Sequence, residues 1–82
     1  MMNQQIWMHD IVALLDDTPA QHLLTGGQLL LRRGQMGTVV MTYDGRTFEV
    51  EFAGRDGRAF AILPIKAENL MVLRDTLEPT AV

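Results

Sequence analysis

Arginines beside glycine-containing turns are the side chains of this sequence whose type and spacing could bind phosphate. They are Arg32, Arg33, Arg46 and Arg58. A strip of arginines attracts the phosphates of nucleic acid, and this attraction supplies most nonspecific affinity. However, the chain has a formal net charge of −3, and acidic residues are interleaved with the arginines. Stacking of single-stranded bases also needs aromatic side chains, and Tyr43 is the candidate on this segment. Nucleic-acid binding is therefore an alternative hypothesis, and the main prediction is a protein partner.

Two histidines and two glutamates are the other side chains that could do chemistry. His9 and His22 match no ligand spacing of a metal site, and the chain contains no cysteine. Glu49 and Glu51 are one strand period apart, which fits a solvated strand face as well as a catalytic pair. A general base would also need a nucleophile and an oxyanion site, and the sequence contains no serine. We expect no enzymatic activity, no cofactor and no metal ion.

The clearest elements that would position these side chains form a hairpin. Residues 35–43 are rich in β-branched types, which favour strands. Asp44-Gly45 follows and predicts a two-residue type I′ turn. Residues 46–53 then alternate apolar and polar types, so that period two creates one apolar face. That face consists of Phe48, Val50 and Phe52.

Three further segments read as strands, at residues 8–15, 58–65 and 70–74, with one helical turn at 66–69. Five short strands in one small chain predict an all-β fold, a closed or nearly closed barrel. We expect residues 1–7 to be a flexible leader and residues 75–82 a loose tail. The predicted core is Val39, Met41, Phe48, Val50, Phe52 and Ile62, with a few neighbours.

An uncharged, leucine-rich segment at residues 20–31 interrupts this pattern. We expect a helical turn over residues 19–24, a hinge at Gly26-Gly27 and an extended lead-in to Arg32. The segment's leucines are Leu23, Leu24, Leu29, Leu30 and Leu31. A small barrel has little interior, so these side chains either complete the core or leave an exposed apolar patch of the kind that marks a partner site. Both outcomes are open from the sequence.

Several motifs in order resemble the bacterial family called domain of unknown function 4926. They are "HDIVALLDDTP", "RRGQMGTVV", "TFEVEFAGRDGRAFAILPI" and "LMVLR", between residues 8 and 74. The resemblance implies an SH3-like barrel of residues 8–74, in which residues 20–31 look like an insertion. It also implies an association with toxin–antitoxin or nuclease genes. The segment Gly34-x-x-Gly37-x-Val39 is similar to a KOW motif, although a tight bend into a strand explains the two glycines without RNA.

Our functional prediction is a non-catalytic protein-interaction module that binds itself or an operon-encoded basic partner such as a toxin or nuclease. The predicted contact consists of the five leucines and Trp7, helped by an N-terminal third that carries aspartates and no basic residue. A KOW-like RNA-binding module using the four arginines and a structural subunit of a larger complex are the alternatives. No apolar run is long enough to span a bilayer, and residues 1–31 lack the basic start of a signal peptide. We therefore expect a cytoplasmic protein without a membrane partner.

Overall fold

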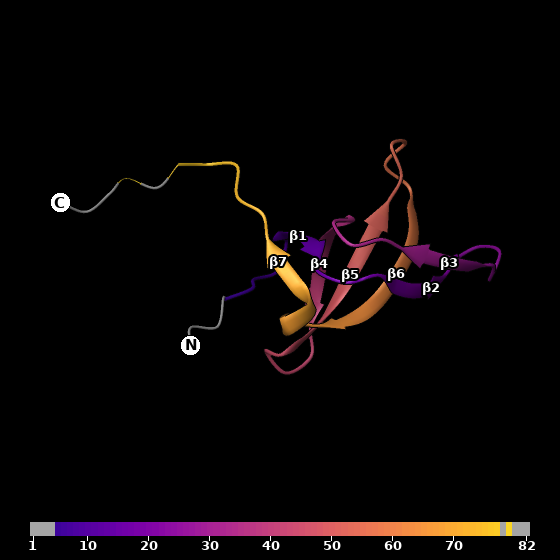
Figure 1. Cartoon of the computed structure of the whole chain (residues 1–82), viewed down its shortest axis with the longest axis horizontal. Coiled ribbons are helices and arrows are strands. Elements are labelled where there is room, and N and C mark those ends of the chain that lie inside the picture. Colours follow the sequence, from indigo (N-terminus) through magenta and orange to yellow (C-terminus); the bar gives the residue numbers. More distant parts are fainter. Residues whose placement is uncertain (1–4, 78, 80–82) are drawn as a thin grey trace.

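A computed structural model describes residues 5–77 and 79 of the chain (Figure 1). Within these residues the fold is all-β, with seven strands in two antiparallel sheets and one short 3-10 turn. The strands are β1 (Ile11–Leu14), β2 (Thr18–Gln21), β3 (Gln28–Leu31), β4 (Met36–Thr42), β5 (Thr47–Ala53), β6 (Ala59–Lys66) and β7 (Leu70–Val72). The 3-10 turn η1 (Ala67–Asn69) lies where a helical turn was predicted.

The larger sheet has five strands in the order β6-β5-β4-β1-β7, and each corresponds to one predicted strand segment. β4, β5 and β6 form a meander of consecutive hairpins, and β7 returns to pair with β1. The predicted apolar face of β5 is confirmed, because Phe48, Val50 and Phe52 are all buried. β6 is at one edge of this sheet, which is where Pro64 is tolerated.

The prediction for residues 19–31 is partly wrong. The segment forms a separate β2–β3 hairpin with four paired rungs, from Thr18↔Leu31 to Gln21↔Gln28. The predicted helical turn does not begin at Pro19, because residues 19–21 belong to strand β2 and Pro19 pairs with Leu30. The extended lead-in to Arg32 is confirmed as β3. In Figure 1 the hairpin projects from one side of the larger sheet.

Two predicted core residues are on the outer face instead. Met41 is 45% exposed because a β-bulge between Val39 and Met41 shifts the register and places Met41 opposite Glu49. Ile62 is 37% exposed because it pairs with Glu51, on the solvated face of β5. The remaining predicted core residues are buried. The buried apolar side chains of the described residues are Val12, Ala13, Leu14, Leu31, Val39, Phe48, Val50, Phe52, Ala61, Ile65 and Leu70.

The β4–β5 connection is not the predicted type I′ turn. That turn needs positive φ at both central residues, whereas only Gly45, at φ +79°, has one. Tyr43 N–H bonds to Thr47 C=O and closes the loop. The Asp44 carboxylate accepts the backbone N–H groups of Arg46 and Thr47, both at 2.8 Å, which lowers its pKa. The loop is therefore closed by an aspartate cap.

The predicted leader at residues 1–7 and tail at residues 75–82 lie partly outside the described residues, which begin at residue 5 and omit 78 and 80–82. Residues 75–77 contain no strand. No helix in the described part of the chain has the length and apolar character needed to cross a membrane.

Candidate interaction surface

The tip of the β2–β3 hairpin is ordered by its own hydrogen bonds. His22 N–H bonds to Gly27 C=O, and Gly26 N–H bonds to His22 C=O, both at 2.8 Å. His22 Nδ1 accepts the backbone N–H groups of Leu24 at 3.1 Å and Thr25 at 3.4 Å. Gly26 has a φ of +72°, which other residue types rarely adopt. These bonds hold Leu23 and Leu24 at the tip of a defined loop, directly before the predicted hinge at Gly26-Gly27.

The structure divides the five predicted leucines between the core and the surface. Leu31 is buried in the core and Leu29 packs against it, so Leu31 is not available to a partner as predicted. Leu30 points to the other side of β3 and is 55% exposed, as alternation along a strand requires. At the tip, Leu23 is 48% exposed and Leu24 is 87% exposed. Three of the five leucines therefore remain as candidate contacts.

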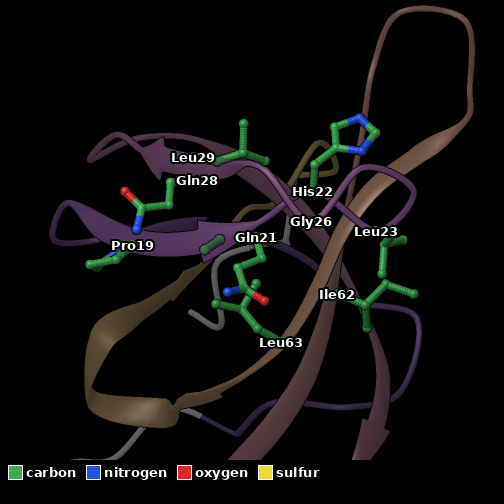
Figure 2. A pocket seen from close by; sticks show the side chains of 10 residues that line it. Pro19, Gln21, His22, Leu23, Gly26, Gln28, Leu29, Ile62 and Leu63 are labelled. Atoms are coloured by element: carbon green, nitrogen blue, oxygen red, sulfur yellow. The ribbon is translucent and has the colours of Figure 1, made fainter.

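A groove of about 740 Å³ separates the hairpin from β6. Its walls include Pro19, Gln21, Leu23 and Leu29 from the hairpin and Ile62 and Leu63 from β6. Figure 2 shows the side chains of Leu23 and Ile62 pointing toward one another at one end, while the ring of His22 points away from the groove. Leu23 N–H also bonds to Phe60 C=O at 2.9 Å, which links the hairpin to β6. The lining is polar and apolar in about equal measure, because Gln21 and Gln28 lie beside the aliphatic side chains.

The base of the hairpin is fixed by Asp17. Its Oδ1 accepts the backbone N–H of Arg33 at 2.8 Å and lies 3.3 Å from Nε of Arg32. The Arg33 hydrogen bond and the Arg32 charge hold the pKa of Asp17 below its usual value. Asp10 likewise accepts the backbone N–H of Trp7 at 2.8 Å. Two of the aspartates in the N-terminal third, Asp10 and Asp17, therefore already accept hydrogen bonds from this chain.

The four predicted phosphate-binding arginines are not on one surface. Arg46 immediately precedes β5 and Arg58 follows the turn after β5, so these two are at opposite ends of that strand. Arg32 is paired with Asp17 at the hairpin base. Tyr43, the candidate stacking platform, donates its hydroxyl hydrogen bond to Glu49, which raises the pKa of the phenol. The four arginines therefore do not form a continuous basic strip around Tyr43.

Trp7 is 65% exposed and is not part of the core. In the view of Figure 1 the described residues before β1 lie to the left of the larger sheet and the β2–β3 hairpin lies to its right.

An apolar strip on the outer face of the larger sheet was missed by the sequence analysis. Ala13 of β1 pairs with Met36 on one side and Met71 on the other. Met36 is 58% exposed and Met71 is 47% exposed, and they flank the small alanine. The β6 wall of the groove was also missed. Within the described residues no group of three or more histidine, cysteine, aspartate or glutamate side chains could hold a metal ion.

Neither a search of curated proteins nor a search of solved structures found a protein similar to this chain. A family model described as "Domain of unknown function (DUF4926)" matches residues 8–72, which span β1 through β7. The sequence resemblance is thus confirmed over both sheets, and the chain belongs to the domain of unknown function 4926 family.

Proposed function

We propose that this protein is a non-catalytic interaction module that binds another protein, or a second copy of itself, through the β2–β3 hairpin. The observation that carries the proposal is the division of the leucines along one hairpin. Leu31 packs into the core and secures the base, whereas Leu24 is 87% exposed at the tip. Solvent exposure of clustered large aliphatic side chains is typical of surfaces that contact a partner.

The order of the hairpin tip supports the same function. A leucine-rich loop that is flexible in solution loses conformational entropy when it binds. Here His22 and Gly26 already hold the tip in one conformation. Leu23 and Leu24 are thus presented on a defined loop, and less ordering is required on association.

We also propose that the larger sheet is an SH3-like barrel. Support comes from the five-strand antiparallel order, from the return of β7 to β1, and from the 3-10 turn before β7. In that arrangement the β2–β3 hairpin is the insertion between the first two barrel strands. A basic toxin or nuclease remains the partner class implied by the family resemblance.

A double variant, Leu24→Asp with Leu30→Asp, tests the contact. Leu77→Asp is its control, because Leu77 is 99% exposed and is not part of the hairpin. Light scattering over a concentration range measures the mass of each chain. If the protein self-associates, the wild type and Leu77→Asp exceed 9.2 kDa and the double variant does not. If the wild type is monomeric, the same three chains are compared for complex formation with proteins encoded beside it. Equal behaviour of all three chains would contradict the proposal.

The RNA-binding alternative has a separate test. It predicts a salt-sensitive complex with single-stranded RNA that Arg32→Glu with Arg33→Glu abolishes. The separation of Arg46 from Arg58 along β5 gives this alternative no support. A structural subunit of a larger complex would bind through the same exposed leucines.

A further inference from the structure

We propose that the free edge of β6 beside the hairpin binds an extended segment of a partner protein, which adds to the sheet as a further strand. The segment alternates apolar and basic side chains. This inference rests on the proposed function, because it specifies how a protein partner occupies the groove next to the exposed leucines. Strand addition at a sheet edge is a general mode of peptide recognition, in which the main chain supplies affinity and alternate side chains supply specificity.

The direction of the backbone groups in β6 carries the argument. Ala67, directly after β6, donates its N–H to Arg46 C=O on the β5 side. Backbone groups alternate along a strand, so from Ala61 to Ile65 the odd-numbered residues face β5 and the even-numbered residues face away from it. The register irregularity between Phe52 and Ala53 breaks this alternation only at the start of β6. Two observations agree with this assignment. Phe60 C=O accepts a hydrogen bond from Leu23, outside the sheet, and Pro64 sits where it removes no ladder bond.

It follows that the N–H and C=O of Ile62 and the C=O of Pro64 face the groove. Among the described residues, β2 and β6 belong to different sheets and are not paired as strands, although Leu23 N–H bonds to Phe60 C=O nearby. The hairpin thus bonds to this edge of β6 at Phe60, and the backbone groups of Ile62 and Pro64 are available to a partner. Unpaired strand edges are templates for the backbone of another chain. The groove volume of about 740 Å³ is within the range of sites that hold ligands.

The side chains around this edge define the chemistry of the added strand. On one face the groove offers Leu63 and Leu29, which suit an aliphatic side chain. On the other face Ile62 pairs with Glu51, and Pro64 pairs with Glu49. A lysine or arginine on the added strand can lay its aliphatic stem along Ile62 and bring its charge toward these glutamates. An alternating apolar and basic segment fits both faces.

The probe is the peptide acetyl-Val-Lys-Val-Lys-Val-Lys-Val-amide, titrated into the full-length protein and followed by NMR. Two controls are a peptide of the same composition with the lysines in one block and a peptide with glutamate in place of lysine. We expect the alternating basic peptide to bind most tightly. We also expect it to slow hydrogen exchange of the Ile62 amide, with little change at Leu63, whose N–H already faces β5.

Two backbone variants and one side-chain variant test the edge itself. Ile62→Pro removes the N–H that faces the groove without removing a hydrogen bond between β5 and β6. Pro64→Ala adds a second N–H that faces the groove. Because one hydrogen bond is gained or lost, we expect Ile62→Pro to weaken peptide binding and Pro64→Ala to strengthen it, each roughly two- to tenfold. Ile62→Val keeps the N–H and should bind as the wild type does. Circular dichroism checks that each variant is folded.

The inference would be overturned by no binding at millimolar peptide or by equal binding of the alternating and block peptides. Shifts located away from β6, or equal affinity for Ile62→Pro and Pro64→Ala, would also overturn it. Shifts at β6 that grow with protein concentration alone would assign the edge to a second copy and also overturn it. Failure of the proposed function is distinguishable, because it is measured on the Leu24 and Leu30 double variant. If that variant loses its complex but the peptide does not bind, the proposed function holds and this inference fails. If the variant keeps its complex but the peptide binds, this inference holds and the proposed function fails.

Discussion

Gly37 on β4 lies directly against the ring of Phe52 on β5. A Cβ atom at position 37 would come within 2.9 Å of Cε1 of Phe52 and 2.6 Å of Cγ1 of Val50. Both neighbours are fully buried, so neither can move aside into solvent. The second glycine of the Gly-x-x-Gly motif is thus explained by close packing between two strands.

Gly37→Ala is therefore expected to destabilise the fold by overpacking, by about 1–3 kcal/mol. Urea unfolding followed by circular dichroism measures the loss. The control is Gly34→Asn, because Gly34 has a φ of +90° and open space around a Cβ. Asparagine tolerates that backbone conformation, so the control should lose less. Equal losses at positions 34 and 37 would mean that the contact with Phe52 adds nothing to the cost of replacing glycine, since Gly37 has no positive φ.

Leu31 and Leu30 are neighbours on β3 with opposite environments. Leu31 is 3% exposed in the core and Leu30 is 55% exposed. We expect Leu31→Ala to cost about 2–5 kcal/mol of unfolding free energy, because it leaves a cavity. Leu30→Ala should change stability by no more than about 0.5 kcal/mol. Chemical denaturation of the two variants is the measurement, and similar values for both would contradict the alternation of β3.

The strands of the larger sheet could be predicted where apolar and polar side chains alternate with a period of two residues. Phe48, Val50 and Phe52 alternate with glutamates, and this alternation identifies both the strand and its buried face. Met41 does not follow the alternation of buried and exposed residues, because the bulge after Val39 adds one residue to β4. No pattern in the sequence predicts this bulge. The outer position of Met41 follows from the register alone.

The candidate site could be predicted only as a segment. Leu29, Leu30 and Leu31 are identical residues, so the sequence carries no alternation to tell the buried from the exposed. The strand that pairs with them contains threonine, proline and glutamine, which give no apolar pattern. Residues 59–63 are apolar on both faces, so the sequence did not show which side would line the groove.

His22 and Thr25 order different parts of the hairpin tip. His22 Nδ1 accepts the amides of Leu24 and Thr25, whereas Thr25 Oγ1 accepts the amide of Gly27 at 3.1 Å. We expect His22→Phe to speed hydrogen exchange at Leu24 and Thr25, because their acceptor is lost. NMR exchange rates, residue by residue, provide the measurement.

Thr25→Val is the complementary variant for the same tip. It keeps the shape of the side chain and removes its oxygen, so exchange should increase at Gly27 and stay unchanged at Leu24. If both variants accelerate all three amides alike, the tip opens as one unit and the two acceptors do not act separately.

Tyr43 and Glu49 make a hydrogen bond whose effect can be measured directly, because the chain contains one tyrosine. The bond to the glutamate raises the pKa of the phenol above its usual value of 10.0. The folded state therefore holds this proton more tightly than the unfolded state does. Its contribution to stability is present below pH 10.0 and is lost as the pH rises through the raised pKa. Ultraviolet absorbance of the phenolate reports the titration.

Glu49→Gln should bring the midpoint of this titration down toward 10.0, because the charged acceptor is gone. Glu51→Gln is the matched control, since it removes the same charge from the same face of β5 without a bond to Tyr43. Its midpoint should remain near that of the wild type. Circular dichroism during the titration checks that the chain stays folded. Equal midpoints for the Glu49 variant and the wild type would show that the hydroxyl does not donate to Glu49 in solution. Tyr43 would then be free to act as a stacking surface, as the RNA-binding alternative requires.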